Sequence, residues 1–99
     1  MSYQVRYTKK AKNDLGRLYG FLIEQDIIAA RTALEAIKKG IEFLQDFPFT
    51  CRKATTNNPL IREMIISFRA NGYVILFEIE NKDTVTIMTV RHQREEDYY

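Results

Sequence analysis

The chain has 99 residues, which is enough for one domain with a single hydrophobic core. Apolar residues make up 45% of it and aromatic residues 12%, a composition that excludes an intrinsically disordered chain. The 15 Lys and Arg residues exceed the 13 Asp and Glu residues by little, and a net charge of +2 is too small to indicate nucleic-acid binding by itself.

Several classes of protein are excluded by missing features. The single cysteine, Cys51, cannot form an internal disulfide, and no Cys/His cluster indicates a zinc site. The N-terminal segment MSYQVRYTKK lacks the apolar core of a signal peptide, and no apolar run is long enough to span a bilayer. Nucleotide-binding loops and metalloprotease motifs are absent too. We therefore expect a cytoplasmic protein with no membrane partner, no metal and no cofactor.

The N-terminal half predicts a strand followed by two helices. Residues 3–7 alternate in polarity, which is typical of a short strand, and we expect this strand at a sheet edge. Thr8 stands where a helix N-cap belongs. Apolar residues then recur at helical spacing over about residues 8–25 and 28–46, and the very short link near Asp26 makes these helices an antiparallel pair. The two apolar stripes consist of Ala11, Leu15, Leu18 and Leu22, and of Ala30, Leu34, Ile37, Ile41 and Leu44.

The C-terminal half predicts three strands after an irregular segment. Pro48 ends the second helix, and residues 47–59 carry no periodic pattern. Strands are expected over residues 60–68, 73–80 and 84–90, with an Asn-Gly turn within residues 69–72. A meander of three strands must bury its apolar face against the helical hairpin. The predicted fold is therefore a single α+β domain over residues 1–99, with the order β-α-α-β-β-β and the helical hairpin packed on an antiparallel sheet.

The charges are unevenly distributed, since residues 51–69 hold Arg52, Lys53, Arg62 and Arg69 against Glu63 alone. We expect the turn at Arg69 and residues 91–94 to lie on the same side of the sheet and to form a basic cleft beneath the helices. Such a cleft binds phosphate or carboxylate equally well, and scattered solvated arginines are the alternative. The only histidine, His92, can serve as general acid or base near neutral pH, or can simply be a surface residue at a strand end.

Three segments resemble the RelE/ParE superfamily of toxins from bacterial type II toxin–antitoxin systems. They are YTKKAKNDL, PLIREMIISFRANGYVILFEI and VTIMTVRHQREEDYY, and together they cover nearly the whole chain. The superfamily's spacing of Arg, Phe, Tyr and Phe appears in the middle segment, and V-x-H-x-R-x-x-x-Y closes the chain. This combination is specific for the superfamily but separates its branches poorly.

The ParE-like branch is understood to bind and inhibit DNA gyrase without a nuclease site. The long helical hairpin and the RHQRE ending are more similar to this branch, and the near-neutral charge fits a toxin that acts by binding. We therefore expect gyrase inhibition without chemistry of the toxin's own. The contact surface would consist of Arg62, Arg69, Arg91, Arg94 and Tyr98.

The RelE-like branch cuts mRNA on the ribosome without metal, and this activity is the alternative hypothesis. Basic residues would stabilise charge that develops on the scissile phosphate, and a histidine or tyrosine would exchange the 2′-OH proton. Gln93 stands where this branch has a further basic residue. The matching positions on this chain are Arg52, Lys53, Arg69, His92 and Tyr99.

Both branches imply a cognate antitoxin as partner. A partly disordered segment of the antitoxin would wrap the toxin and cover its sheet and helical hairpin, which requires exposed apolar residues. The apolar positions that the helical stripes leave unused are Phe21, Ile23, Phe43 and Phe47. Operator DNA would be contacted only through the antitoxin. An inactive family member that only binds its antitoxin is a third hypothesis.

Overall fold

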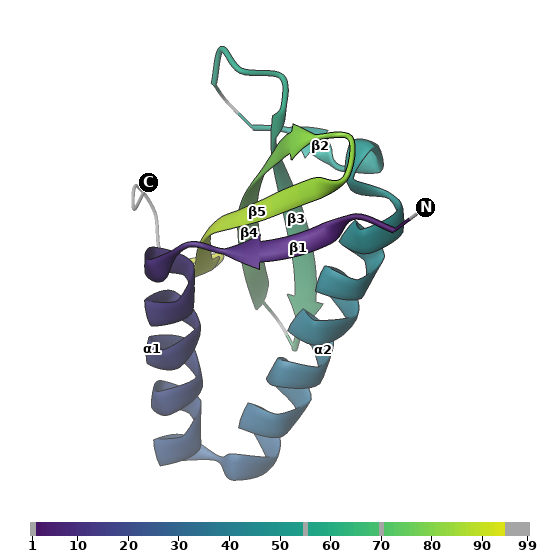
Figure 1. Ribbon diagram of the computed structural model, residues 1–99. Helices are drawn as coiled ribbons and strands as arrows, with labels where there is room; N and C mark the ends of the chain where they lie inside the picture. The colour runs from purple at the N-terminus through teal and green to yellow at the C-terminus, as the bar shows by residue number, and fades with distance from the viewer. Residues whose placement is uncertain (1, 55, 70, 95–99) are drawn as a thin grey trace.

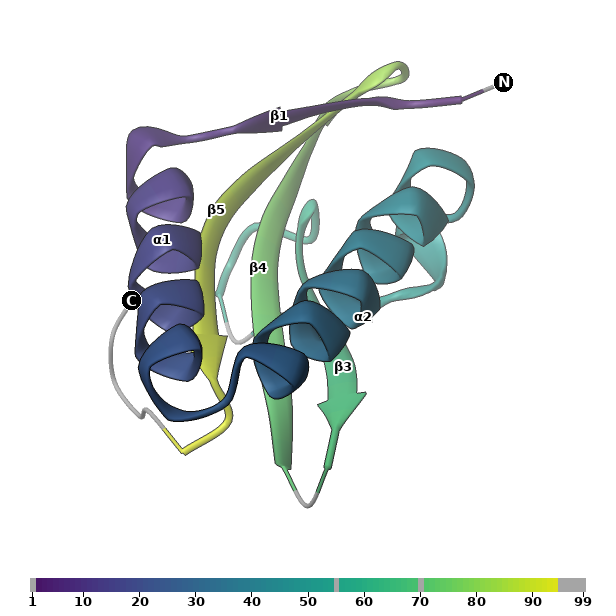
Figure 2. The same cartoon turned by 90° about the horizontal axis from the view of Figure 1, so that it is seen from below.

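Two helices cover one face of a five-stranded sheet (Figures 1 and 2). The computed structural model describes residues 2–54, 56–69 and 71–94. Its elements in chain order are β1 (Gln4–Tyr7), α1 (Lys9–Gln25), α2 (Ile27–Asp46), the 3-10 helix η1 (Pro48–Thr50), β2 (Arg52–Lys53), β3 (Ile61–Phe68), β4 (Asn71–Asn81) and β5 (Thr84–His92). The predicted order β-α-α-β-β-β is confirmed, with β2 as an addition.

The strands lie side by side in the order β1-β5-β4-β3-β2. The three long C-terminal strands form the predicted antiparallel meander. The short strand β1 takes an edge position, as expected, but pairs in parallel with β5. Parallel neighbours need a long connection, and the helical hairpin and the meander together supply it. The sheet is therefore mixed and not antiparallel throughout.

The second edge strand, β2, lies within the segment 47–59 that we expected to be irregular. Arg52 pairs with Glu63 of β3, and Lys53 pairs with Arg62. The Arg52 guanidinium also lies 3.2 Å from the Glu63 carboxylate. A strand of two residues has no periodicity to detect, and its formation depends on contacts with β3.

The helical hairpin begins and ends at polar caps. The Thr8 hydroxyl accepts a hydrogen bond from the Ala11 N–H at 3.0 Å, which confirms the predicted cap of α1. Asp26 is the single residue between the helices, and its carboxylate accepts from the N–H groups of Ile28 and Ala29. None of the described helices is long and apolar enough to cross a lipid bilayer.

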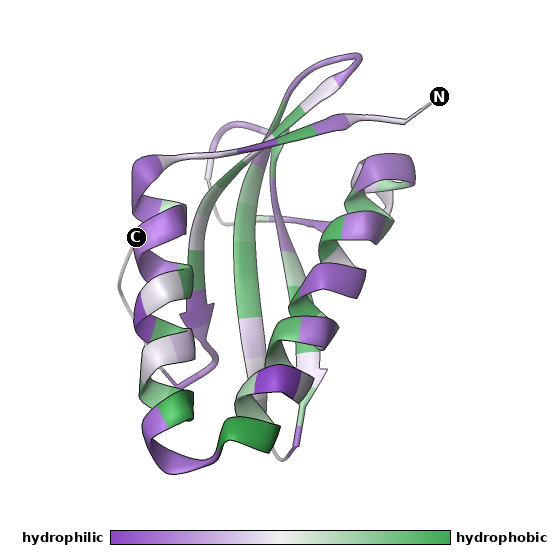
Figure 3. Ribbon diagram, turned by 60° about the horizontal axis from the view of Figure 1, so that its bottom comes forward, coloured by the Kyte–Doolittle hydropathy of each residue, from purple (hydrophilic) through white to green (hydrophobic). Residues whose placement is uncertain are grey.

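The hydrophobic core lies between the helices and the two central strands. Figure 3 shows apolar residues along β4 and on the sides of the helices that face it. Ile75 and Phe77 of β4 and Ile87 of β5 have no exposed area. Most of the two predicted stripes is buried or half-buried, but Leu34 is 46% exposed and Ala33 takes its place in the core.

The β3–β4 turn lies two residues before the predicted Asn-Gly turn. Phe68 pairs with Asn71 across the hairpin, so the connecting loop begins at Arg69, whose φ is 57°. Gly72 lies inside the hairpin, opposite Ser67. The position requires glycine because a Cβ there would overlap the carbonyl oxygen of Ile66. The hairpin was predicted correctly, whereas the residues assigned to its turn were wrong.

Candidate functional site

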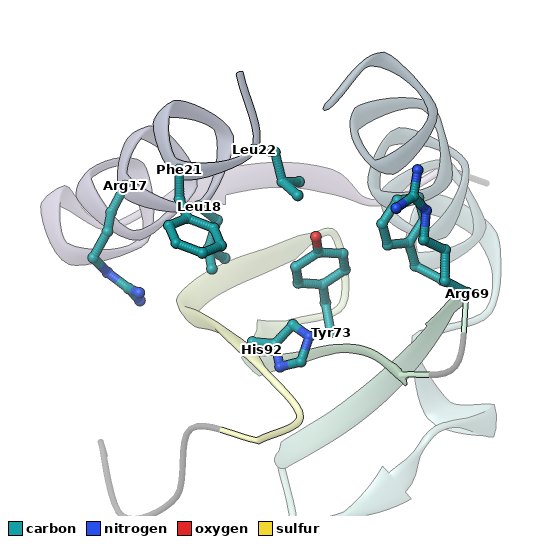
Figure 4. Close-up of a pocket in the computed structure, with 8 residues that line it drawn as sticks. Arg17, Leu18, Phe21, Leu22, Arg69, Tyr73 and His92 are labelled. Carbon is teal, nitrogen blue, oxygen red and sulfur yellow. The ribbon is translucent and has the colours of Figure 1, made fainter. Parts of the chain in front are cut away.

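A half-open hollow of about 630 Å³ lies between α1 and the adjoining ends of β3, β4 and β5 (Figure 4). Apolar side chains form its walls, an aromatic ring forms its floor, and cationic and imidazole groups stand at its rim. We call it the Tyr73 hollow. It is lined by Arg17, Leu18, Phe21, Leu22, Phe68, Arg69, Tyr73 and His92.

Tyr73 of β4 provides the floor of the hollow. Its ring packs against Phe68, with 5.9 Å between ring centroids, and meets His92 edge-on at 5.7 Å. Only 2% of the residue is exposed, and Figure 4 shows the hydroxyl pointing into the hollow. Burial raises the pKa of Tyr73, while the positive charge of Arg69 acts in the opposite direction. The phenol is therefore neutral at physiological pH and available as a hydrogen-bond donor.

His92 is held at the end of β5 by its own neighbours. It lies opposite Tyr73 in the β4–β5 register. Its Nδ1 accepts a hydrogen bond from the Arg94 N–H at 3.1 Å, so the neutral ring carries its proton on Nε2. The Arg91 guanidinium lies within 3.5 Å of the carbonyl oxygens of His92 and Gln93. The Arg94 N–H and the Tyr73 ring hold the imidazole beside the hollow, while Arg91 holds the backbone at the end of β5.

Arg69 stands on the side of the hollow opposite Arg17 (Figure 4). Its Nη2 lies 3.5 Å from Oδ2 of Asp26, and its guanidinium lies over the Phe68 ring, 5.4 Å from the centroid. The hydrogen bond from the Ala29 N–H is the main cause that lowers the pKa of Asp26, and Arg69 lowers it further. The ion pair joins the tip of the helical hairpin to the β3–β4 turn.

Asp14 positions the α1 side of the hollow, and the sequence analysis did not single it out. The residue is 6% exposed. Its carboxylate accepts from the Val90 N–H at 3.0 Å, lies 3.1 Å from Lys10 Nζ and lies 3.8 Å from the Arg17 guanidinium. It therefore ties α1 to β5 and orients Arg17 at the rim. The sequence held a signal, since Asp14 falls between Ala11 and Leu18 on the buried stripe of α1.

Comparison with known proteins identifies the family. A family model described as the ParE toxin of the type II toxin–antitoxin system parDE matches residues 5–97. The chain belongs to this family. It is 31% identical over 86 residues to Toxin RelE3 of Caulobacter vibrioides, and the alignment covers 87% of this chain and 89% of that protein. Family membership implies a cognate antitoxin as partner of this toxin.

A solved structure supports the fold. The chain superposes on a protein of the chromosomal ParDE toxin–antitoxin system from P. aeruginosa with a TM-score of 0.70. The match covers 92% of this chain and 96% of the other, at 16% sequence identity. The resemblance to the RelE/ParE superfamily and the predicted α+β fold are both confirmed.

The structure brings some of the predicted site residues of this toxin together. Arg69 and His92 open onto one hollow, as the sequence predicted, and the helical wall of this hollow comes from α1. Arg91 and Arg94 belong to the same end of β5. Tyr98 and Tyr99 lie outside the described residues. Among the residues that the structure describes, no group of three His, Cys, Asp and Glu side chains could hold a metal ion.

Other predicted site residues lie at the opposite end of β3. Arg52 and Lys53 pair with the start of β3, roughly 20 Å of strand from Arg69. Arg62 is engaged by the chain itself, since its guanidinium donates to carbonyl oxygens of the segment 47–59 and lies over the Phe49 ring at 5.3 Å. Of the five positions that match the RelE-like pattern, the structure describes four, and these four are divided between two places.

The four apolar positions predicted for antitoxin binding are all exposed, but they form two surfaces. Phe21 and Ile23 lie near the tip of the helical hairpin, where Figure 3 shows apolar residues on both helices beside a hydrophilic turn. Phe43 and Phe47 lie at the other end of α2, with their ring centroids 5.4 Å apart. Beside Phe43, a groove of about 580 Å³ runs between α2 and β3. Cys51 lines this groove, and burial raises the pKa of its thiol, which argues against a nucleophile.

Proposed function

We propose that this toxin acts by binding DNA gyrase through the Tyr73 hollow and inhibiting it, with no chemistry of its own. The observation that carries the proposal is the separation of Arg52 and Lys53 from Arg69 and His92. A nuclease without metal needs several cations around one phosphate, because charge develops there in the transition state. Two cations that lie roughly 20 Å of strand away cannot serve the same phosphate.

The hollow has the properties of a docking site for a protein. Its walls are apolar, and cations stand at opposite sides of its rim. Binding energy at protein interfaces is concentrated where an apolar anchor enters a desolvated pocket and polar groups surround it. The matching element of the target is an apolar side chain next to a carboxylate, which Arg69 would hold.

The experiment is a titration of DNA supercoiling by purified gyrase with the purified toxin. We expect supercoiling to stop at stoichiometric or low micromolar toxin. Unchanged supercoiling at a large excess of folded toxin would refute the proposal.

Ribosome-dependent mRNA cleavage is the second candidate. It is favoured by one local feature, the imidazole of His92 and the guanidinium of Arg69 in the same hollow. A general acid or base and a phosphate-binding cation are two of the groups that such a reaction needs. Its test is mapping of mRNA 5′ ends in a translating extract. If His92→Ala and Arg69→Gln leave codon-specific cleavage unchanged, this assignment of the reaction is wrong.

We also propose that the antitoxin covers the groove between α2 and β3. In the part of the chain that the structure describes, β2 pairs only with the start of β3, so the outer edge of residues 64–68 accepts a further strand. Phe43 and Ile65 lie exposed beside this edge and would pack on the apolar side chains of that strand. Amide hydrogen exchange of residues 64–68 should slow when antitoxin is added, and unchanged exchange in a formed complex would place the antitoxin elsewhere.

A further inference from the structure

We propose that Asp26 is an internal competitor of the target: its carboxylate occupies Arg69 in the free toxin, and the target must displace it to dock at the Tyr73 hollow. Asp26 would thereby determine how tightly the toxin binds its target. This inference rests on the proposed function in one respect, that Arg69 contacts the target.

The contact joins two segments that are far apart in the sequence. Asp26 lies at the tip of the helical hairpin, and Arg69 begins the loop between β3 and β4. Oδ2 of Asp26 lies 3.5 Å from Nη2 of Arg69. Because Arg69 lines the hollow, any anionic group that enters the hollow and binds this guanidinium competes with Asp26 for it.

The turn geometry of Arg69 helps to fix the place of its side chain. Its φ of 57° lies in the left-handed region, which favours glycine, yet the position holds a long cationic side chain. The favoured two-residue hairpin loops place their first central residue in this region, and Arg69 holds that position between the paired Phe68 and Asn71. Here the Phe68 ring and the Asp26 carboxylate hold the guanidinium beside the hollow.

The pairing is weak enough to be exchanged. The side chains of Arg69 and Asp26 are 62% and 48% exposed, and water screens a pair of this kind. A target carboxylate that arrives with an apolar anchor would gain a similar charge interaction in a drier setting. Asp26 would then turn to solvent while it continues to cap α2.

The two tasks of Asp26 use different oxygens, which makes them separable by mutation. Oδ1 accepts the hydrogen bonds from the N–H groups of Ile28 and Ala29 that cap α2. Oδ2 lies closest to Arg69. Asn and Ser are both good N-caps but carry no charge, so either substitution removes the competitor and keeps the helix.

The experiment compares Asp26→Asn and Asp26→Ser with wild type, first in gyrase supercoiling and then in growth arrest after induced expression at matched soluble levels. We expect both variants to need about two- to fivefold less toxin for half-maximal inhibition, the range that an exposed ion pair can contribute. In an Arg69→Gln background the same substitutions should have no effect. Glu24→Gln, which removes an exposed acid two residues before Asp26 in α1, is the matched control and should behave like wild type.

The outcomes separate this inference from the proposed function. Gyrase inhibition that is equal or weaker in both Asp26 variants would overturn the inference and leave the proposed function standing. No gyrase inhibition by any chain, with stronger growth arrest by the Asp26 variants, would refute gyrase as target and support the inference. If wild type and the Asp26 variants are equally inert in both assays, both proposals fail.

Discussion

Asp14 shows how one buried side chain can set the geometry of a binding surface. Its carboxylate binds a backbone N–H of β5 and two cations of α1. The Val90 N–H that it accepts from belongs to the strand that ends at His92. Asp14 therefore holds α1 against β5 and thereby fixes the distance between the two sides of the Tyr73 hollow.

We expect Asp14→Ala to lower the free energy of unfolding by about 1–3 kcal/mol, because a buried N–H loses its acceptor. Asp14→Asn should lose less, since the amide oxygen can still accept from Val90. Lys12→Ala, at an exposed position of the same helix, is the control and should stay within about 0.5 kcal/mol of wild type. Urea unfolding measures all three, and equal stability of Asp14→Ala and Lys12→Ala would contradict the role of Asp14.

Ionisation of Tyr73 should lower the stability of the folded protein at alkaline pH. Burial raises its pKa above the ordinary value of 10.0, so the unfolded chain loses this proton at a lower pH than the folded chain does. Stability from the neutral phenol is fully present below about pH 10 and is lost as the pH rises toward the folded pKa. Burial raises the pKa of Tyr7 in the same direction.

Tyr73→Phe should therefore reduce the decrease in the free energy of unfolding at alkaline pH. At neutral pH the free energy of unfolding should change by less than about 1 kcal/mol, since the hydroxyl points into the hollow and not into the core. Urea unfolding between neutral pH and pH 11 or so measures both effects. Equal alkaline slopes for the variant and wild type would show that Tyr73 is not the titrating group.

At the scale of elements, the sequence predicted the two helices well because their positions depend on caps, apolar spacing and proline, which are local features. The Thr8 cap, the apolar stripes and Pro48 located both helices to within about two residues. The β3–β4 turn was predicted at the wrong residues because an Asn-Gly pair is a strong turn signal. In this protein Gly72 is instead required by close contact with the backbone at Ile66. That contact comes from hairpin register, which the sequence pattern did not reveal.

Gly72→Ala tests this explanation of the turn. We expect a loss of about 1–3 kcal/mol or more in the free energy of unfolding, because the added Cβ would overlap a backbone oxygen that cannot move cheaply. Gly16→Ala is the matched control, since a Cβ there meets nothing within 4 Å in an exposed helix interior. That substitution should stabilise by about 0.5–1 kcal/mol. Equal effects of the two would mean that Gly72 is not required by close packing.

At the scale of the whole molecule, the sequence predicted the end of the sheet at which the Tyr73 hollow lies, but it did not predict all of the residues that line this hollow. The meander alone was enough to bring Arg69 and His92 to one end of the sheet. It did not reveal that Arg17 reaches the same hollow from α1, because that depends on how the helix packs. The sequence also did not reveal that Arg52 and Lys53 lie far from this end of the sheet, because the pairing of β2 with the start of β3 has no periodic signature.

This separation of charges leads to the most direct test of the account. Two double variants, Arg69→Gln with His92→Gln and Arg52→Gln with Lys53→Gln, remove groups at the Tyr73 hollow and in β2 and can be titrated side by side against gyrase supercoiling. We predict that the pair at the hollow weakens inhibition at least tenfold and that the pair in β2 leaves it within about twofold of wild type. Equal losses, or a greater loss from the β2 pair, would contradict the assignment of target binding to the Tyr73 hollow.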